Sequence, residues 1–245
     1  MQLALSTWQE VEDYLRGQTG IIIPIGSVEQ HGPNGLIGTD HLTSEFVARG
    51  VGERIGCMVA PTLAYGMSQH HLGFTGSATL RPSTLMLVVC DVVQSLAVHG
   101  FRRFFFINGH GGNVASVTAA FSELYARHSL GEAEAKLRCR MSFWFGPRTL
   151  VLTKELYGDA EGSHATCSEV SLAQYYQPQA IKQAQMSPHV APKSGGFFEA
   201  ADYRARFADG RIGSAPSLSS PEHGKRFYDA AVLDMIDAYK TFLAY

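Results

Sequence analysis

Two acidic side chains and a histidine follow closely on a short apolar run near the N-terminus. Glu29 and His31 are two residues apart, so on an extended backbone their side chains leave the same face. Asp40 follows in a loop rich in glycine and proline that is long enough to fold back toward the same point. Taken singly they are ordinary: a solvated acid, a surface histidine and, for Asp40, a helix N-cap. Together, behind an apolar run typical of a buried strand, they favour a site for a divalent metal.

A lone histidine, His110, lies in a second glycine-rich segment that spans residues 108–113 and also follows an apolar run. Glycines between a strand and a helix can bind an anion, but the segment lacks both the Gly-x-Gly-x-x-Gly pattern and a P-loop lysine. A histidine between glycines is better explained as a ligand that needs close backbone approach. We therefore expect Asn113 to cap the following helix and Asn108 to hydrogen-bond within the ligand shell.

Two further segments carry histidines without deciding their role. His164 precedes Glu169 by five residues, and a helix beginning at Cys167 or Ser168, with Glu169 as a favourable acid in its first turn, explains this pattern without any chemistry. The loop at residues 65–77 contains two adjacent histidines and can shape a pocket. A functional role for either segment requires that the fold bring it next to the two loops described above.

The rest of the sequence predicts alternating strands and helices, which would position these loops. Thr7 and Glu10 form a possible capping box for a first helix. Strands are predicted at residues 20–26, 57–60, 103–107 and 136–145, and helices at 41–55, 82–98, 114–128, 168–176 and 221–243. Residues 177–213 are expected to be mostly irregular. The alternation implies a parallel or mostly parallel sheet, whose strands gather ligands at their carboxyl ends.

Composition narrows the class of protein. The 245 residues suffice for one sizeable domain or two small ones, and 20 basic against 22 acidic residues give a net charge of −2, which argues against a nucleic-acid partner. No apolar run approaches the length that crosses a bilayer, and the first residues lack a signal-peptide pattern. The four cysteines are far apart, which fits a reducing cytoplasm. We expect a cytoplasmic protein with no nucleic-acid or membrane partner.

Taken together, the motifs resemble the signatures of the creatininase (creatinine amidohydrolase) family. Residues 23–33 with Asp40 resemble the first signature, 65–77 the second and 108–113 the third. His164 and Ala165 resemble the start of a fourth, and residues 209–224 resemble the segment before a final helix. The resemblance covers nearly the whole chain, so we expect a single creatininase-like domain over residues 1–245.

The resemblance implies a three-layer α/β/α fold with a mostly parallel central sheet and two divalent ions per chain. By matching position, one ion would be held by Glu29, Asp40 and His110, and the second by His31 with Asp40 as the bridge. Creatininase has a further glutamate where this chain has Gly112, and Glu169 would supply that ligand instead. Carboxylate and imidazole ligands suit zinc, manganese or ferrous iron.

The implied activity is hydrolysis of a non-peptide C–N bond in a cyclic amide or a formamide by metal-activated water. His164 would give a proton to the leaving amine, and the substrate pocket would include Ser68, His71, Asn108 and Asn113. Gly112 makes creatinine itself a poor candidate. Related enzymes also include formamidopyrimidine-nucleotide deformylases of flavin or deazaflavin synthesis and peptidases that mature small redox peptides. A deformylase-like enzyme and a catalytically silent metal-binding subunit are the alternatives, and the family suggests a homo-oligomer, commonly a hexamer.

Overall fold

A parallel sheet of four strands organises the computed structural model, which describes residues 1–193 and 195–244. The strand order is β2-β1-β3-β4, and every pairing is parallel. The strands are β1 (Gly20–Ile25), β2 (Met58–Val59), β3 (Arg103–Asn108) and β4 (Arg138–Phe143). The predicted α/β class and the four strand positions are confirmed.

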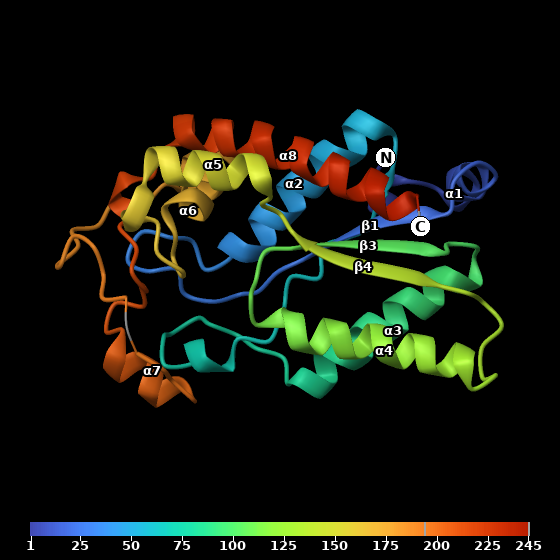
Figure 1. Ribbon diagram of the computed structural model, residues 1–245, viewed down its shortest axis with the longest axis horizontal. Coiled ribbons are helices and arrows are strands. Elements are labelled where there is room, and N and C mark those ends of the chain that lie inside the picture. Colours follow the sequence, from blue (N-terminus) through green and yellow to red (C-terminus); the bar gives the residue numbers. More distant parts are fainter. Residues whose placement is uncertain (194, 245) are drawn as a thin grey trace.

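Helices cover both faces of the sheet, which gives three layers (Figure 1). Because successive side chains on a strand point to opposite faces, Ile21 and Phe104 pack toward α3 (Pro82–Val98) and α4 (Asn113–Ser129). Their neighbours Ile22 and Phe105 pack on the other face against α2 (Thr39–Ile55) and α8 (Pro221–Leu243). Strands β1 and β3 are therefore apolar on both faces, as expected for the centre of a parallel sheet.

The remaining helices lie outside these layers or at their ends. Helix α1 (Trp8–Leu15) begins with the predicted capping box between Thr7 and Glu10. Helix α6 (Cys167–Tyr176) agrees with the predicted helix at residues 168–176.

Two helices correct the sequence prediction. Helix α5 (Pro147–Leu156) was not predicted, and its N-terminus depends on the carboxylate of Asp234 in α8, which accepts hydrogen bonds from Arg148 N and Thr149 N. No local pattern reveals a contact with a residue so distant in sequence. Helix α7 (Ala200–Arg206) lies in the stretch expected to be irregular, where the Glu199 side chain caps a short helix. Within that stretch, residue 194 lies outside the described residues.

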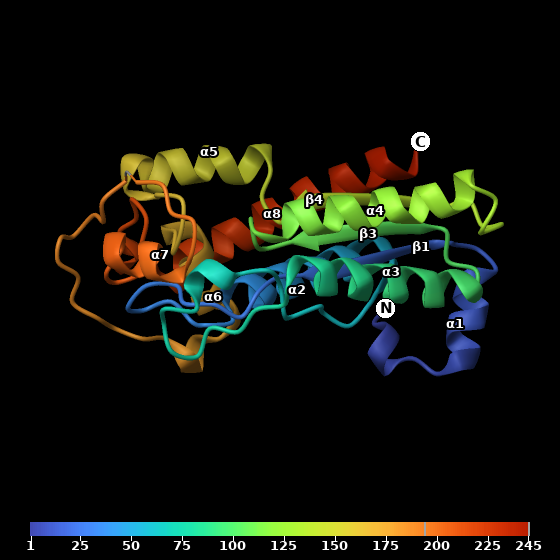
Figure 2. The same cartoon turned by 90° about the horizontal axis from the view of Figure 1, so that it is seen from below.

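The loops that carry chemistry meet at one end of the sheet. In both Figure 1 and Figure 2, α6 and α7 lie beyond the carboxyl ends of the strands, next to the loops that leave β1 and β3. Among the described residues, every helix is too short or too polar to cross a membrane.

Candidate metal centre

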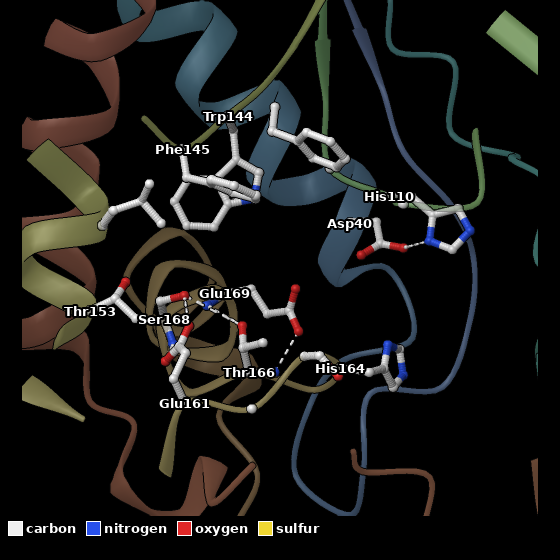
Figure 3. A pocket seen from close by; sticks show the side chains of 16 residues that line it. Asp40, His110, Trp144, Phe145, Thr153, Glu161, His164, Thr166, Ser168 and Glu169 are labelled. Carbon is white, nitrogen blue, oxygen red and sulfur yellow. Dashed lines mark hydrogen bonds and ion pairs between the residues drawn. The ribbon is translucent and has the colours of Figure 1, made fainter. Parts of the chain in front are cut away.

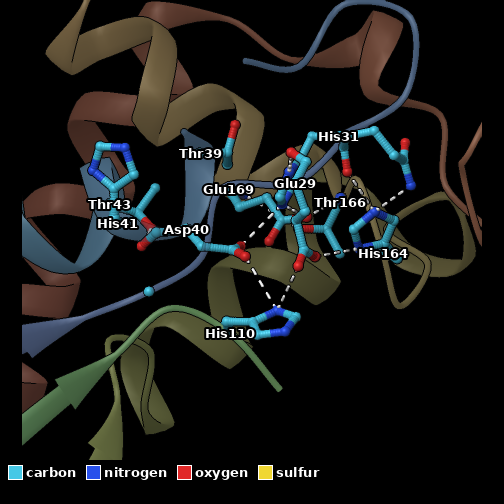
Figure 4. A network of polar contacts seen from close by, with 12 residues as sticks. Glu29, His31, Thr39, Asp40, His41, Thr43, His110, His164, Thr166 and Glu169 are labelled. Carbon is cyan, nitrogen blue, oxygen red and sulfur yellow. Dashed lines mark hydrogen bonds and ion pairs between the residues drawn. The ribbon is translucent and has the colours of Figure 1, made fainter. Parts of the chain in front are cut away.

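Four side chains from three segments converge where β1 and β3 end (Figure 4). Glu29 and His31 follow β1, Asp40 is the second residue of α2, and His110 follows β3. The loop after β1 is fixed by a hydrogen bond from Glu29 N to the carbonyl of Ile37 at 2.9 Å. Glu29 is fully buried, and His31, Asp40 and His110 are 1%, 2% and 6% exposed. Such buried acids and imidazoles need partners within the protein or a bound cation.

Two overlapping groups of side chains share Asp40, and a third group joins Glu29, His31 and His164. In the first, His110 Nδ1 lies 3.2 Å from Glu29 Oε2 and 3.1 Å from Asp40 Oδ2. In the second, His31 Nε2 lies 2.9 Å from Asp40 Oδ1 and 3.9 Å from Glu169 Oε1. The potential ligand atoms of each group lie within 4.8 Å of one another, and Asp40 belongs to both. This arrangement could hold two ions with Asp40 between them.

Backbone carbonyls orient the two histidines of these groups. His31 Nδ1 lies 3.1 Å from the carbonyl oxygen of Glu29, and His110 Nε2 lies 2.9 Å from that of Met67. A carbonyl oxygen only accepts, so these nitrogens carry hydrogen, and the opposite nitrogen of each ring faces the carboxylates. An imidazole anchored in this way through one nitrogen presents the other to a metal.

Three carboxylate oxygens support the interpretation of this cluster as a metal site. Both oxygens of Glu29 and Oδ2 of Asp40 are buried and have no hydrogen-bond partner among the described residues. The nearby imidazole nitrogens approach Glu29 within ion-pair distance, but without hydrogen-bonding geometry. Buried carboxylate oxygens are costly unless they are paired. A divalent cation among them would satisfy all three, so the side chains present fit a metal.

The carboxylates of the cluster raise the pKa values of His31 and His110. Burial lowers the pKa of His31, but Asp40, Glu169 and Glu29 outweigh it and raise that pKa to about 10. Burial also lowers the pKa of His110. The carboxylates of Glu29 and Asp40 outweigh burial and raise that pKa well above its usual range. A metal ion must displace these protons from the ring nitrogens, so metal affinity should rise with pH.

Glu169 belongs to the cluster through a helix cap. Thr166 is the N-cap of α6, and the Glu169 carboxylate accepts a hydrogen bond from Thr166 N at 2.5 Å while lying near His31. Burial, together with Asp40 and against the opposing effect of His31, raises the pKa of Glu169 to about 7. Glu169 thus caps α6 and lies near His31 at the same time.

Gly112 lies where a larger side chain does not fit. A Cβ atom at this position would lie 2.2 Å from the carbonyl oxygen of Met67 and 2.4 Å from His110 Nε2. These are the two atoms of the hydrogen bond that orients His110. A glutamate at position 112 would therefore disrupt the same site that it was meant to complete.

A cavity of about 360 Å³ opens beside the cluster (Figure 3). Asp40, His110, His164 and Glu169 contribute to its lining, and the aromatic side chains of Trp144 and Phe145, which follow β4, form one wall. Glu161, Thr166, Ser168 and Thr153 form a polar region of the same cavity. Sequence reasoning missed both walls, although an aromatic run directly after β4 was a signal at the same edge of the sheet.

The four residues expected in the substrate pocket lie elsewhere. Ser68, His71, Asn108 and Asn113 are buried and do not line this cavity. Asn108 instead holds the backbone of His110, with its Nδ2 2.6 Å from the carbonyl oxygen and its Oδ1 3.1 Å from the amide nitrogen. These short-range bonds give Asn108 a role in fixing the backbone around His110.

Asn113 does not cap α4, because Gly112 occupies the cap position. Its side chain instead joins three loops: Nδ2 donates to the Gly26 carbonyl at 2.9 Å and to Asn108 Oδ1 at 3.1 Å, while Oδ1 accepts from Met67 N at 3.0 Å. This buried amide fixes the segments around the cluster rather than the start of the helix.

Comparisons with known proteins match nearly the whole chain. Residues 4–239 match the family described as Creatininase, creatinine amidohydrolase. The creatinine amidohydrolase of Pseudomonas putida is 30% identical over 251 aligned residues, which cover 96% of this chain and 94% of that one. The mycofactocin precursor peptide peptidase of Mycolicibacterium smegmatis is 38% identical over 110 residues, which cover 42% of this chain and 44% of the peptidase.

Solved structures extend the similarity to the fold. A crystal structure of creatinine amidohydrolase has a TM-score of 0.85 at 25% identity and covers 97% of this chain and 95% of its own. A manganese form of creatininase has a TM-score of 0.81 at 25% identity, with 98% and 97% covered. The three-layer fold described above is thus similar to that of solved creatininase structures.

Proposed function

The chain belongs to the creatininase family of hydrolases, and we propose that it uses a two-metal centre to hydrolyse a cyclic amide or a formamide. The observation that carries this proposal is the pair of ligand groups that share Asp40. Their buried carboxylate oxygens have no hydrogen-bond partner among residues 1–193 and 195–244. Hydrophobic packing alone gives no reason to bury so many acids and imidazoles in one place.

Each ion would have three protein ligands in this proposal. Glu29, Asp40 and His110 would hold the first, and His31, Asp40 and Glu169 the second. Mixed oxygen and nitrogen ligands suit zinc, manganese or ferrous iron. When bound, such a pair of ions makes water more acidic and stabilises negative charge on an amide oxygen.

His164 is the proposed proton donor to the leaving nitrogen. Its ring lies beside that of His31, with 4.8 Å between centroids, and it lines the cavity. Burial, with smaller effects from His71 and His31, lowers the pKa of His164 well below its usual range, so the ring is neutral until a reaction step supplies a proton. His164→Ala should retain both ions while turnover falls by about 10²–10⁴-fold, the usual contribution of a positioned acid or base. Unchanged turnover, or loss of an ion, would contradict this role.

A second candidate substrate is a short peptide. The local similarity to a mycofactocin precursor peptide peptidase favours it, because identity over that stretch exceeds the identity to the full-length creatinine amidohydrolase.

Creatinine itself remains disfavoured by Gly112. The cavity of about 360 Å³ admits a small amide, and its aromatic wall suits a planar ring.

The test is metal analysis combined with a substrate panel. Purified protein loaded with zinc, manganese or ferrous iron would be assayed for ammonia, amine or formate release from cyclic amides, formamides and short peptides. Two ions per chain with hydrolysis of a cyclic amide or formamide is the expected result. Bound metal without hydrolysis of any member would favour a silent subunit, and peptide cleavage alone would favour the second candidate. Protein that binds no metal would refute the proposal.

We also propose that the enzyme is a cytoplasmic homo-oligomer, as its family suggests, with a hexamer as the expected assembly. Light scattering coupled to size-exclusion chromatography would measure its mass. A monomer at micromolar concentration would contradict this assignment.

A further inference from the structure

The amide of Gln30 lies between two histidines that do not belong to either group sharing Asp40. Its Nε2 is 2.9 Å from His71 Nδ1, 2.9 Å from His164 Nε2 and 3.0 Å from the carbonyl oxygen of Gly210. Gln30 is 7% exposed and His71 is 1% exposed. Water is thus largely excluded, and the protons must be shared among these groups.

Two backbone groups of opposite polarity fix which way the amide points. Gly32 N donates to Gln30 Oε1 at 2.8 Å, and the Gly210 carbonyl accepts from Nε2. A flipped amide would place two donors together at Gly32 and two acceptors together at Gly210. The close approach is built into the chain, because a Cβ atom at residue 210 would lie 1.8 Å from Gln30 Oε1. The nitrogen of the amide therefore faces both histidines.

The amide has only two hydrogens for four neighbours, the fourth being the Tyr203 hydroxyl oxygen at 3.5 Å, which itself donates to the Gly210 carbonyl at 2.7 Å. One goes to the Gly210 carbonyl, which can only accept. His164 Nε2 has another partner, the backbone carbonyl of Gln30 at 2.9 Å, whereas His71 Nδ1 has no other partner among the described residues. Every group is satisfied if the second amide hydrogen goes to His71 Nδ1 and His164 donates from Nε2 to the carbonyl.

We propose that Gln30 is a positioning residue that holds His71 and His164 as their Nε2–H tautomers. His71 then places an N–H 3.2 Å from Glu29 Oε1, where it stabilises the charged carboxylate and is not available to bind a metal. His164 turns its Nδ1 lone pair toward the cluster, 3.7 Å from Glu29 Oε1. Neither tautomer depends on the proposed function, although the use made of Nδ1 rests on it.

The tautomer of His164 sets the order of proton transfer in the proposed hydrolysis. A bare Nδ1 must first take a proton from the water whose oxygen adds to the carbonyl carbon. The same proton then passes to the nitrogen as the C–N bond breaks, and the imidazole returns to its starting form. His164 thus acts as a base before it acts as an acid, while Nε2–H stays on the Gln30 carbonyl.

Neutron diffraction from deuterium-exchanged crystals of the metal-loaded protein tests the assignment, because it locates the hydrogens directly. The expected map has deuterium on Nε2 of both His71 and His164 and none on either Nδ1. Deuterium on Nδ1 of either ring would overturn the proposal. A map without metal at the cluster would instead count against the proposed function, while the tautomers could still be read.

The Gln30→Glu variant should reverse the protonation of His71 Nδ1. A carboxylate cannot donate, so His71 should acquire deuterium on Nδ1 to pair with it. The control is Gln69→Glu, which makes the same charge change in the neighbouring loop, where Gln69 Nε2 donates to the Phe198 carbonyl. The control should leave both tautomers as in the wild type. An unprotonated His71 Nδ1 in Gln30→Glu would overturn the role of the amide, and should that variant fail to fold, the wild-type map decides alone.

Discussion

Substitution of Glu169 by glutamine separates the two proposed ions. Glu169 belongs to the group with His31 and Asp40 and is absent from the group with Glu29 and His110. Gln still accepts the hydrogen bond that caps α6, because either Glu or Gln serves at this position of a capping box. The variant therefore removes a charged ligand and retains the local fold. We expect metal content to fall from two ions per chain toward one.

The size of the effect follows from linkage. Loss of one of three ligands should weaken the second site by at least the ~10–100-fold that changes beside a metal ligand produce. At a free metal concentration of 100 times the wild-type dissociation constant, an occupied site adds about 2.7 kcal/mol to the free energy of unfolding. A 100-fold weakening would leave the site half occupied and remove about 2.3 kcal/mol of this contribution, which should lower the Tm by roughly 5–9 °C for a chain of this length.

The difference in stability between Glu169→Gln and the wild type should change sign when metal is removed. Burial raises the folded-state pKa of Glu169 to about 7, above its unfolded value, so its ionisation opposes folding as pH rises from the unfolded pKa through 7. Gln cannot ionise. In excess chelator at pH 8, Glu169→Gln should therefore be at least as stable as the wild type, although it is the less stable protein with metal.

The assay combines metal analysis by mass spectrometry with thermal unfolding, with and without chelator. Glu10→Gln is the matched control, because Glu10 occupies the same capping position in α1, is exposed and lies outside the cluster. The control should keep two ions and show no metal-dependent change in its Tm relative to the wild type. If Glu169→Gln binds two ions with wild-type affinity and the same Tm, Glu169 is not a ligand and the assignment of the second site is wrong.

Three further predictions follow from single contacts. Adding Gly112→Glu to the Glu169→Gln variant should not restore the second ion, because the new Cβ would collide with the Met67 carbonyl; metal analysis showing two ions would refute this. Burial raises the pKa of the half-buried Cys139 and of the buried Cys167 to about 12. At pH 8 iodoacetamide should therefore modify them rapidly only after unfolding. Rapid alkylation of either in the native protein, seen by peptide mass spectrometry, would contradict the raised pKa. Asp234→Ala leaves the N-terminus of α5 and the exposed Arg148 guanidinium without their shared partner. Loss of this helix cap should lower the free energy of unfolding by about 1–2 kcal/mol with metal content unchanged. An unchanged free energy of unfolding in urea titration would show that the contact is dispensable.

The helices and strands of the three layers could be predicted from local pattern. The apolar runs of β1 and β3 and the helical spacing in α3 and α8 are signals contained in a few consecutive residues. Loops that carry acids and imidazoles directly after strands also predicted where the chemistry would gather, because parallel strands end at a common edge. Glu29, His31, Asp40 and His110 were identified in this way.

Tertiary structure alone decided what surrounds them. Gln30 meets His164 and Gly210 across more than a hundred residues of chain, and α5 depends on Asp234 in α8. The aromatic wall at Trp144 and the polar wall at Glu161 become parts of one cavity only when β4 and the segment before α6 lie side by side. Local sequence specifies backbone conformation and side-chain type, whereas the partner of a buried polar atom is set by chain segments that meet only after folding, so these contacts could not be read from residue spacing.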